Sequence, residues 1–179
     1  TTPNPLRSEP ARDAFTAWQR ALTPEDNADG WVGQRVGYER FATARFKPAN
    51  NVRSQRITCN DVPALRVVSD GRSAGPAVLY LHGGAYTMGS AQGSIDIAAR
   101  IAAAVNGWAL IPDYRLAPEH PFPAAHDDAL AAYRWLTAHH DKTQSLYIVG
   151  DDAGGALAVA VAIAAAKEKL RRANALYLI

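Results

Sequence analysis

The sequence of 179 residues has a single cysteine, Cys59, and a formal net charge of only +2. One cysteine cannot form an internal disulfide, and no spacing of cysteine and histidine indicates a zinc site. The small charge, with no basic run longer than Arg171-Arg172, argues against a nucleic-acid partner. We therefore expect no metal and no nucleic acid, and a lone cysteine fits a reducing compartment.

Long apolar runs are also missing. The longest, Ala153–Ala166, is rich in alanine and shorter than the roughly 20 residues of a membrane span, so it indicates a buried core helix. The first ten residues are polar and lack the apolar core of a signal peptide. These absences predict a cytoplasmic protein. The sequence stops inside a predicted strand, Ala175–Ile179, from which we expect the chain to continue in the parent protein.

The N-terminal part differs in pattern from the rest. Its polar and aromatic residues predict helices over Pro10–Leu22 and Gly30–Phe46. Between them, Thr23-Pro24 is typical of a helix start, because threonine caps a helix and proline suits its first position. We expect residues 1–50 to form N-terminal cap helices and residues 51–179 to form part of an α/β domain.

From about Val52, strands and helices alternate. Two short strands, 54–59 and 63–69, are predicted to form a hairpin, and Ser94 is a candidate cap for a later helix. Alternation of the remaining elements predicts a mostly parallel sheet flanked by helices, with ligand sites at the carboxyl ends of the strands. These remaining elements are strands at 77–84, 108–115, 145–150 and 175–179 and helices at 94–105, 123–140 and 154–172.

Two predicted strand ends carry unusual residues. HGGAY, residues 82–86, has two glycines that let backbone N–H groups approach a ligand and form an oxyanion hole; a plain glycine turn is the alternative. GDDAGG, residues 150–155, lies between a strand and a helix, which is the setting of a nucleophile elbow. Alternatively, Asp151 or Asp152 simply caps the helix. A phosphate-binding loop is disfavoured, because GxGxxG and a Walker lysine are both missing and two carboxylates would repel phosphate.

A third stretch, DYRLAPEHPFPA at residues 113–124, reads as a strand end and a proline-rich turn. Within it, Arg115 is expected to pair with Glu119 or Asp113. Together the three stretches resemble the motifs of the hormone-sensitive-lipase-like (family IV) carboxylesterases, in the family's order and at compatible spacing. The resemblance covers about residues 50–179, and the N-terminal helices are similar to the family's cap in position.

The resemblance implies an α/β-hydrolase fold whose C-terminal strands are absent from this chain. It also implies hydrolysis of short-chain acyl esters or lactones by a Ser-Asp-His triad, without a cofactor. The nucleophile position falls on Asp152. The remaining implied roles are the oxyanion-hole N–H groups of Gly83, Gly84 and Ala153, the loop-shaping His82, the structural supports Glu119 and Asp128, and the pocket residues Tyr86 and Met88.

Two departures from the family affect activity. Asp152 replaces the serine, and the family's catalytic Asp and His would lie beyond Ile179. None of the histidines present is expected to act as the base: His120, His126, His139 and His140 lie in a turn or at a helix end. A carboxylate is a poor nucleophile toward an ester, and losing the serine costs about six orders of magnitude in kcat in well-studied proteases. We therefore expect the chain as given to be inactive as an esterase.

Several interpretations of Asp152 stay open. The chain is an altered esterase, a pseudoenzyme that keeps the pocket to bind a ligand, or one half of a site that a complementing C-terminal chain or a second copy completes. An Asp-nucleophile hydrolase acting on epoxides or haloalkanes is less favoured, because an HGG-type loop serves acyl transfer. A sheet without its last strands exposes an apolar edge, so we also expect aggregation or dependence on a partner.

Overall fold

A computed structural model describes residues 9–21, 23–28, 30–71 and 74–179. Within these residues, one sheet contains six strands in the spatial order β1 (Val52–Cys59), β2 (Val62–Ser69), β4 (Trp108–Pro112), β3 (Ala77–Leu81), β5 (Leu146–Gly150) and β6 (Ala175–Leu178). β1 and β2 form the predicted antiparallel hairpin, and β4, β3, β5 and β6 are mutually parallel. The predicted mostly parallel α/β sheet is confirmed.

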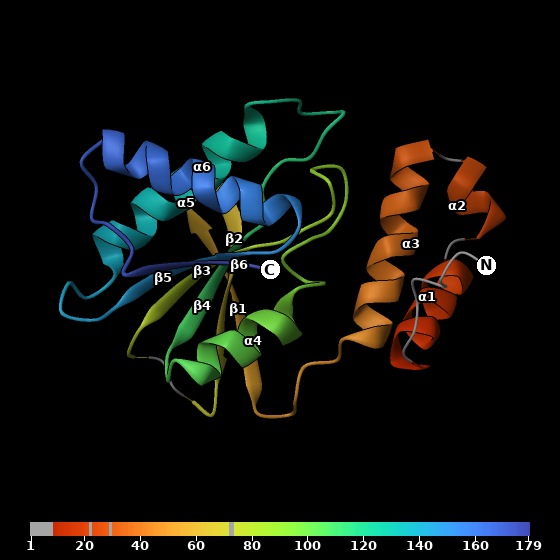
Figure 1. Ribbon diagram of the computed structural model, residues 1–179, viewed down its shortest axis with the longest axis horizontal. Helices are drawn as coiled ribbons and strands as arrows, with labels where there is room; N and C mark the ends of the chain where they lie inside the picture. The colour runs from red at the N-terminus through yellow and green to blue at the C-terminus, as the bar shows by residue number, and fades with distance from the viewer. Residues whose placement is uncertain (1–8, 22, 29, 72–73) are drawn as a thin grey trace, which may run out of the picture.

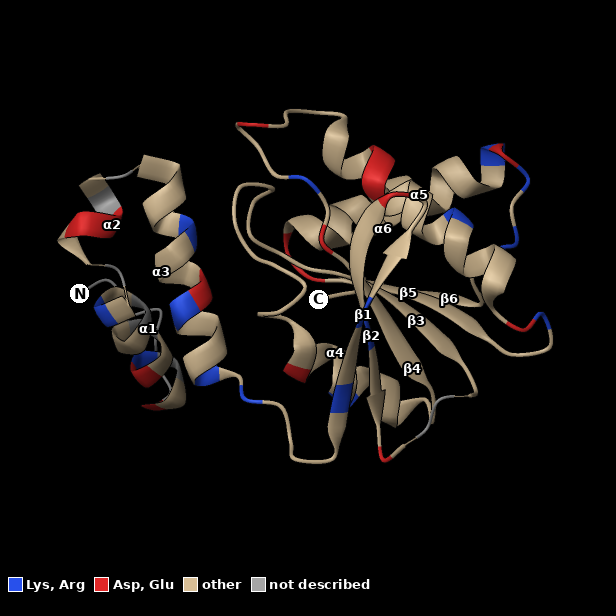
Figure 2. Cartoon of the chain, turned by 180° about the vertical axis from the view of Figure 1, so that it is seen from behind, with Lys and Arg blue, Asp and Glu red and all other residues tan. Residues whose placement is uncertain are grey.

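Helices cover both faces of this sheet (Figure 1). α5 (Ala124–His139) and α6 (Ala153–Lys167) pack on one face, and α4 (Ile95–Ala104) packs on the other. Because both faces are covered, every residue of β3 and β4 is buried, which explains their unbroken apolar runs. These strands, together with β5, are drawn without charged residues in Figure 2.

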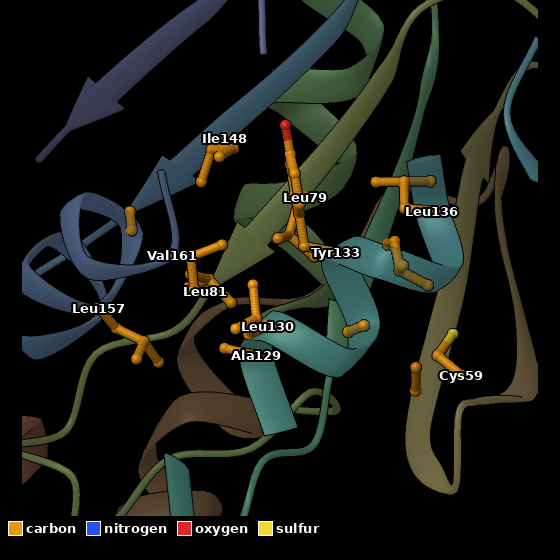
Figure 3. Packing of buried hydrophobic residues seen from close by; sticks show 14 of the residues in the cluster. Cys59, Leu79, Leu81, Ala129, Leu130, Tyr133, Leu136, Ile148, Leu157 and Val161 are labelled. Carbon is orange, nitrogen blue, oxygen red and sulfur yellow. The ribbon is translucent and has the colours of Figure 1, made fainter. Parts of the chain in front are cut away.

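Side chains of β3 alternate between the two faces. Leu79 and Leu81 belong to the cluster that contains Tyr133 of α5 and Val161 of α6 (Figure 3). Val78 and Tyr80 belong instead to the cluster on the α4 face. Side chains therefore pack against β3 on both faces of the sheet, and this packing fixes where the loop after β3 begins.

Three helices precede the sheet: α1 (Glu9–Ala21), α2 (Pro24–Ala28) and α3 (Gly30–Arg45). They agree with the two predicted helices, except that Leu22 lies outside the described residues. The predicted start at Thr23-Pro24 is also observed. The Asp26 N–H donates to Thr23 Oγ1 (3.2 Å) and the Thr23 N–H donates to Asp26 Oδ2 (2.8 Å), a reciprocal cap. The domain boundary at residue 50 stays a prediction.

Two predicted helix ends need correction. Ser94 precedes α4 but does not cap it, because its hydroxyl donates to the carbonyl oxygen of Ser90 (2.9 Å). α6 ends at Lys167 rather than Arg172. Lys169 adopts a left-handed conformation (φ 56°), and the Leu170 N–H turns back to the Ala165 carbonyl (2.9 Å).

The last strand, β6, forms an edge of the sheet and is not buried. Its apolar residues Leu176, Tyr177 and Leu178 are all exposed, as is Ile179. An exposed apolar edge strand can pair with another strand. Among the described residues, no helix has the length and apolarity needed to cross a membrane.

Candidate active site

The GDDAGG stretch forms a sharp turn between β5 and α6. Asp152 has φ 49° and ψ −122°, a conformation that costs energy in any residue with a side chain. Gly154 makes the turn possible, because a Cβ atom there would collide with the carbonyl oxygens of Leu81 and His82 at the end of β3. A strained central residue between a strand and a helix is the geometry of a nucleophile elbow.

The Asp152 carboxylate reaches across to the loop after β3. Its Oδ2 accepts hydrogen bonds from the N–H groups of Gly84 (3.0 Å) and Ala85 (3.2 Å). Asp152 precedes α6 but makes no side-chain cap hydrogen bond, so the interpretation of Asp152 as a simple helix cap is wrong. Hydrogen bonds from the N–H groups of Gly84, Ala153 and Ala85 hold the pKa of this carboxyl below its usual range.

The N–H of Gly83 has a different partner. It donates to Oδ1 of Asp151 (3.0 Å), which also accepts the Tyr80 hydroxyl (2.6 Å). The prediction that Gly83 points at the nucleophile position is therefore corrected: Gly84 and Ala85 point there. Ala85 was missed although it directly follows the two glycines. Its left-handed backbone (φ 52°), continued by Tyr86 (φ 60°), aims its N–H at Asp152.

His82 lies at the base of this loop and is fully buried. Its ring stacks on Tyr114 with 4.2 Å between centroids, and its Nδ1 lies 2.8 Å from the Gly83 carbonyl oxygen. Because burial lowers the pKa of His82, the ring is neutral. The Tyr114 hydroxyl also donates to the His82 carbonyl oxygen (2.5 Å), which ties the loop to the turn after β4.

The proline-rich turn is held by ion pairs that differ from the predicted ones. Arg115 pairs with Asp128 of α5, with Nη2 2.8 Å from Oδ1, and not with Glu119 or Asp113. Glu119 instead binds Arg35 of α3, whose Nη1 lies 2.9 Å from Oε1. Both predicted supports therefore make structural contacts. No sequence signal points to Arg35, which is 84 residues from its partner.

The two predicted pocket residues, Tyr86 and Met88, lie in different surroundings. Tyr86 lines a cavity of about 420 Å³ with Ala85, His120 and Phe122. Met88 closes the turn itself, since its N–H donates to the Gly84 carbonyl oxygen (3.0 Å). A pocket role for Met88 stays a prediction.

The five histidines are all described, and no hydrogen bond joins any of their rings to Asp152. His126 lies 3.2 Å from Asp127, His139 lies 2.8 Å from the Trp135 carbonyl oxygen, and His140 lies 3.1 Å from that of Ser145. Across the described part of the chain, no three His, Cys, Asp or Glu side chains are grouped to hold a metal ion. The described site therefore contains an elbow and backbone donors, without a base at the elbow.

Comparison with known proteins gives consistent matches. A family profile described as the alpha/beta hydrolase fold matches residues 78–179. The chain is 37% identical over 150 residues to the putative acetyl-hydrolase LipR of Mycobacterium tuberculosis, covering 84% of this chain and 48% of that protein. It is 42% identical over 131 residues to an acetyl-hydrolase of Streptomyces hygroscopicus, covering 71% and 42%.

Solved structures of esterases match the same chain. An esterase from the bacterial hormone-sensitive lipase (HSL) family superposes with a TM-score of 0.83 at 34% identity, over 94% of this chain and 55% of that one. An esterase/lipase from an uncultured bacterium gives a TM-score of 0.78 at 38% identity, over 92% and 55%. The resemblance to the hormone-sensitive-lipase-like esterases is confirmed. The chain spans about half the length of the relatives that it matches.

Proposed function

Because the chain belongs to the α/β-hydrolase family, we propose that it carries the nucleophile and oxyanion half of a carboxylic ester hydrolase site. Asp152 stands at the nucleophile position, and the N–H groups of Gly84, Ala85 and Ala153 form the oxyanion hole. One observation carries this assignment: Asp152 Oδ2 lies 3.0 Å from the Gly84 nitrogen and 3.2 Å from the Ala85 nitrogen. The acetyl-hydrolase relatives support a short-chain acyl ester as the parental substrate. The absence of a cofactor stays a prediction.

The same contact supports the proposal that this site does not hydrolyse esters. A serine would attack the ester carbonyl carbon and pass its proton to a base, the alcohol would leave, and water would then release the acid. The carbonyl oxygen needs the backbone donors as it becomes negative. In this chain a negative oxygen of Asp152 already accepts those hydrogen bonds, and its attack on an ester would give a reactive mixed anhydride.

None of the described histidines has a hydrogen bond to Asp152, so the proposed site lacks a base of its own. We propose that a complementing segment or a second copy supplies it, and the exposed apolar edge at β6 supports such pairing. Loop shaping by His82, support by Glu119 and Asp128, and pocket lining by Tyr86 belong to the same proposal. The cytoplasmic location stays a prediction.

Two other functions are testable at the same site. A pseudoenzyme would keep the pocket for a ligand without turnover. An Asp-nucleophile hydrolase would leave Oδ2 on the backbone donors while Oδ1 attacks a saturated carbon, so that a carbon–oxygen bond of an epoxide breaks and an alkyl ester of Asp152 forms. The observed placement of Oδ2 is compatible with this second chemistry. We favour this Asp-nucleophile chemistry less, because the relatives named above are acetyl-hydrolases.

The test compares the Asp152 chain with Asp152→Ser and Asp152→Ala. Each is supplied with the C-terminal half of a related esterase and assayed with p-nitrophenyl acetate. We expect turnover only in the serine form, at least about 10³-fold above both others. Equal ester turnover by the Asp152 and serine forms would contradict the assignment.

Intact-mass measurement after incubation with a small epoxide separates the remaining functions. An adduct on the Asp152 chain, absent from Asp152→Ala, would establish the Asp nucleophile. No ester turnover and no adduct in any correctly folded form, with ligand binding retained, would establish the pseudoenzyme. Circular dichroism of each variant confirms that the fold is intact.

A further inference from the structure

A cavity of about 480 Å³ is lined by residues of α3, of α4 and of the loop after β3, next to Asp151 of the elbow. Figure 1 shows the arrangement of these helices around the sheet. Aromatic side chains form much of its wall: Tyr38 and Phe41 from α3, Phe46 just after α3, and Tyr80 from β3. Asp151 and His82 lie in the same wall. The cavity thus combines several aromatic rings with a carboxylate.

The two carboxylates of the elbow are held only by neutral donors. Asp151 accepts the Tyr80 hydroxyl and the Gly83 N–H, and Asp152 accepts backbone N–H groups. Among the described residues, neither forms an ion pair with a lysine or arginine. Five other acidic residues do form one with an arginine: Asp26, Asp96, Glu119, Asp128 and Glu168. The elbow therefore keeps two negative charges without an ion-pair partner. Asp151 lies in the cavity wall, and the exposed Asp152 lies beside the wall residue Gly83.

The cation in the wall does not cancel this charge. Arg100 is bound to Asp96 of its own helix, with Nε 3.0 Å from Oδ1, and its side chain is 73% exposed. Glu39 of α3 adds a further acid nearby, where it accepts the Ser90 hydroxyl (2.6 Å). Among the charged residues of the wall itself, Asp96 and Asp151 are acidic and Arg100 is basic, so the wall carries a net negative charge.

His82 contributes to the same wall but offers no donor or acceptor to it. Its side chain is 2% exposed, and its Nε2 is a buried atom without a hydrogen-bond partner among the described residues. Because this atom has no accessible surface, a ligand in the cavity does not reach it. The wall at His82 is therefore formed by a buried residue, and the polar character of the wall comes from Asp151.

We propose that this cavity binds a small organic cation, an alkylated ammonium group of an amine or amino alcohol. Aromatic rings attract ammonium groups, and Asp151 and Asp152 supply the opposite charge. The aspartate at the nucleophile position adds one of these charges, so the substitution that silences ester hydrolysis also favours a cationic ligand. The inference deepens the proposed function, because it names the ligand class of the same site. Cation binding is tested by a binding measurement, and ester hydrolysis is tested by turnover. The two proposals can therefore fail separately.

The experiment measures binding to the 179-residue chain by isothermal titration calorimetry at low ionic strength. The probes are choline, its neutral isostere 3,3-dimethylbutan-1-ol, and butyrate. We expect choline to bind at least about tenfold more tightly than the alcohol, and butyrate to bind most weakly. Added salt should weaken choline binding and leave the alcohol unchanged.

Single-residue variants test which side chains contribute to choline binding. Asp152→Asn should weaken choline binding several-fold without affecting the alcohol, and Phe41→Leu should weaken it through the aromatic wall. Asp70→Asn is the control, because Asp70 is exposed at the opposite end of the strands and its positive φ (54°) suits asparagine. Equal affinity for choline and the alcohol, equal effects of Asp152→Asn and Asp70→Asn in folded variants, or no choline binding would each overturn the proposal.

Discussion

The elbow at Gly150–Gly155 is held against the sheet by backbone contacts, whereas α3 is held near the site by side chains. At the elbow, Gly154 brings α6 against the carbonyl oxygens at the end of β3. α3 instead depends on Arg35, whose guanidinium binds Glu119, and on Glu39, which accepts the Ser90 hydroxyl. Backbone contacts cannot be removed without moving the sheet, but polar side-chain contacts can be removed singly. We therefore expect Asp152 to be held rigidly and the aromatic side chains of α3 to be able to shift.

The largest expected effect is at the elbow. Gly154→Ala places a methyl group against backbone atoms that cannot move aside, so we expect the free energy of unfolding to fall by at least about 3 kcal/mol. Gly155→Ala is the matched control, because its Cβ would meet its nearest neighbour, the Gly150 oxygen, at 3.4 Å. Urea denaturation should show a change within about 1 kcal/mol for the control. Similar losses in both variants would show that helix α6 as a whole, and not one close contact, determines the stability of the elbow.

The second effect concerns the half-buried Asp151. Asp151→Ala leaves the buried Tyr80 hydroxyl without its partner, and we expect a loss of about 2–3 kcal/mol in the free energy of unfolding. Tyr80→Phe should cost less, about 1 kcal/mol, because Asp151 keeps the Gly83 N–H. The double variant should lose clearly less than the sum of both. Strict additivity would mean that the two side chains are not coupled.

A smaller effect is expected where α3 meets the rest of the molecule. Arg35→Gln removes the ion pair with Glu119 and the hydrogen bond from Nε to the Thr87 carbonyl oxygen (2.5 Å). Both side chains are partly exposed, so the global free energy of unfolding should fall by only about 1 kcal/mol.

Hydrogen exchange is the sharper measurement for this variant. Amides of α3 should exchange faster, while those of β3 keep their protection. Arg53→Gln, on the exposed edge strand β1, serves as the control. Faster exchange in β3 as well would contradict the difference between the two regions.

The sequence was sufficient to predict elements that are determined locally. β3, β4 and β5 are unbroken apolar runs because helices bury both faces, and the elbow is marked by glycines that permit a close approach. Contacts between segments that are far apart in the sequence have no such local sequence pattern that would predict them. The ion pair of Arg35 with Glu119 depends on how α3 lies beside the sheet, and nothing in the sequence near Arg35 indicates its partner.

The loop after β3 shows the same limit of sequence-based prediction at the level of single residues. The HGGAY motif indicates backbone donors, but which N–H groups face Asp152 depends on dihedral angles that only the folded loop imposes. Ala85 adopts a left-handed backbone against its intrinsic preference, and Gly83 turns toward Asp151. The motif therefore predicts backbone donors in this loop, but it does not determine which of their N–H groups face Asp152.

The smallest expected effect is electrostatic and involves Asp152. Its pKa is lowered in the folded chain by the N–H groups of Gly84, Ala153 and Ala85, so the ionised carboxylate stabilises the fold above the unfolded pKa of about 4. This contribution is lost as the pH falls through the lower, folded-state pKa. The difference in free energy of unfolding between the Asp152 chain and Asp152→Asn should therefore shrink from about pH 7 to about pH 3, measured by urea denaturation. A constant difference across this range would mean that the donors bind an amide oxygen as well as a carboxylate. The negative charge of Asp152 would then contribute nothing to holding the loop after β3 against the elbow.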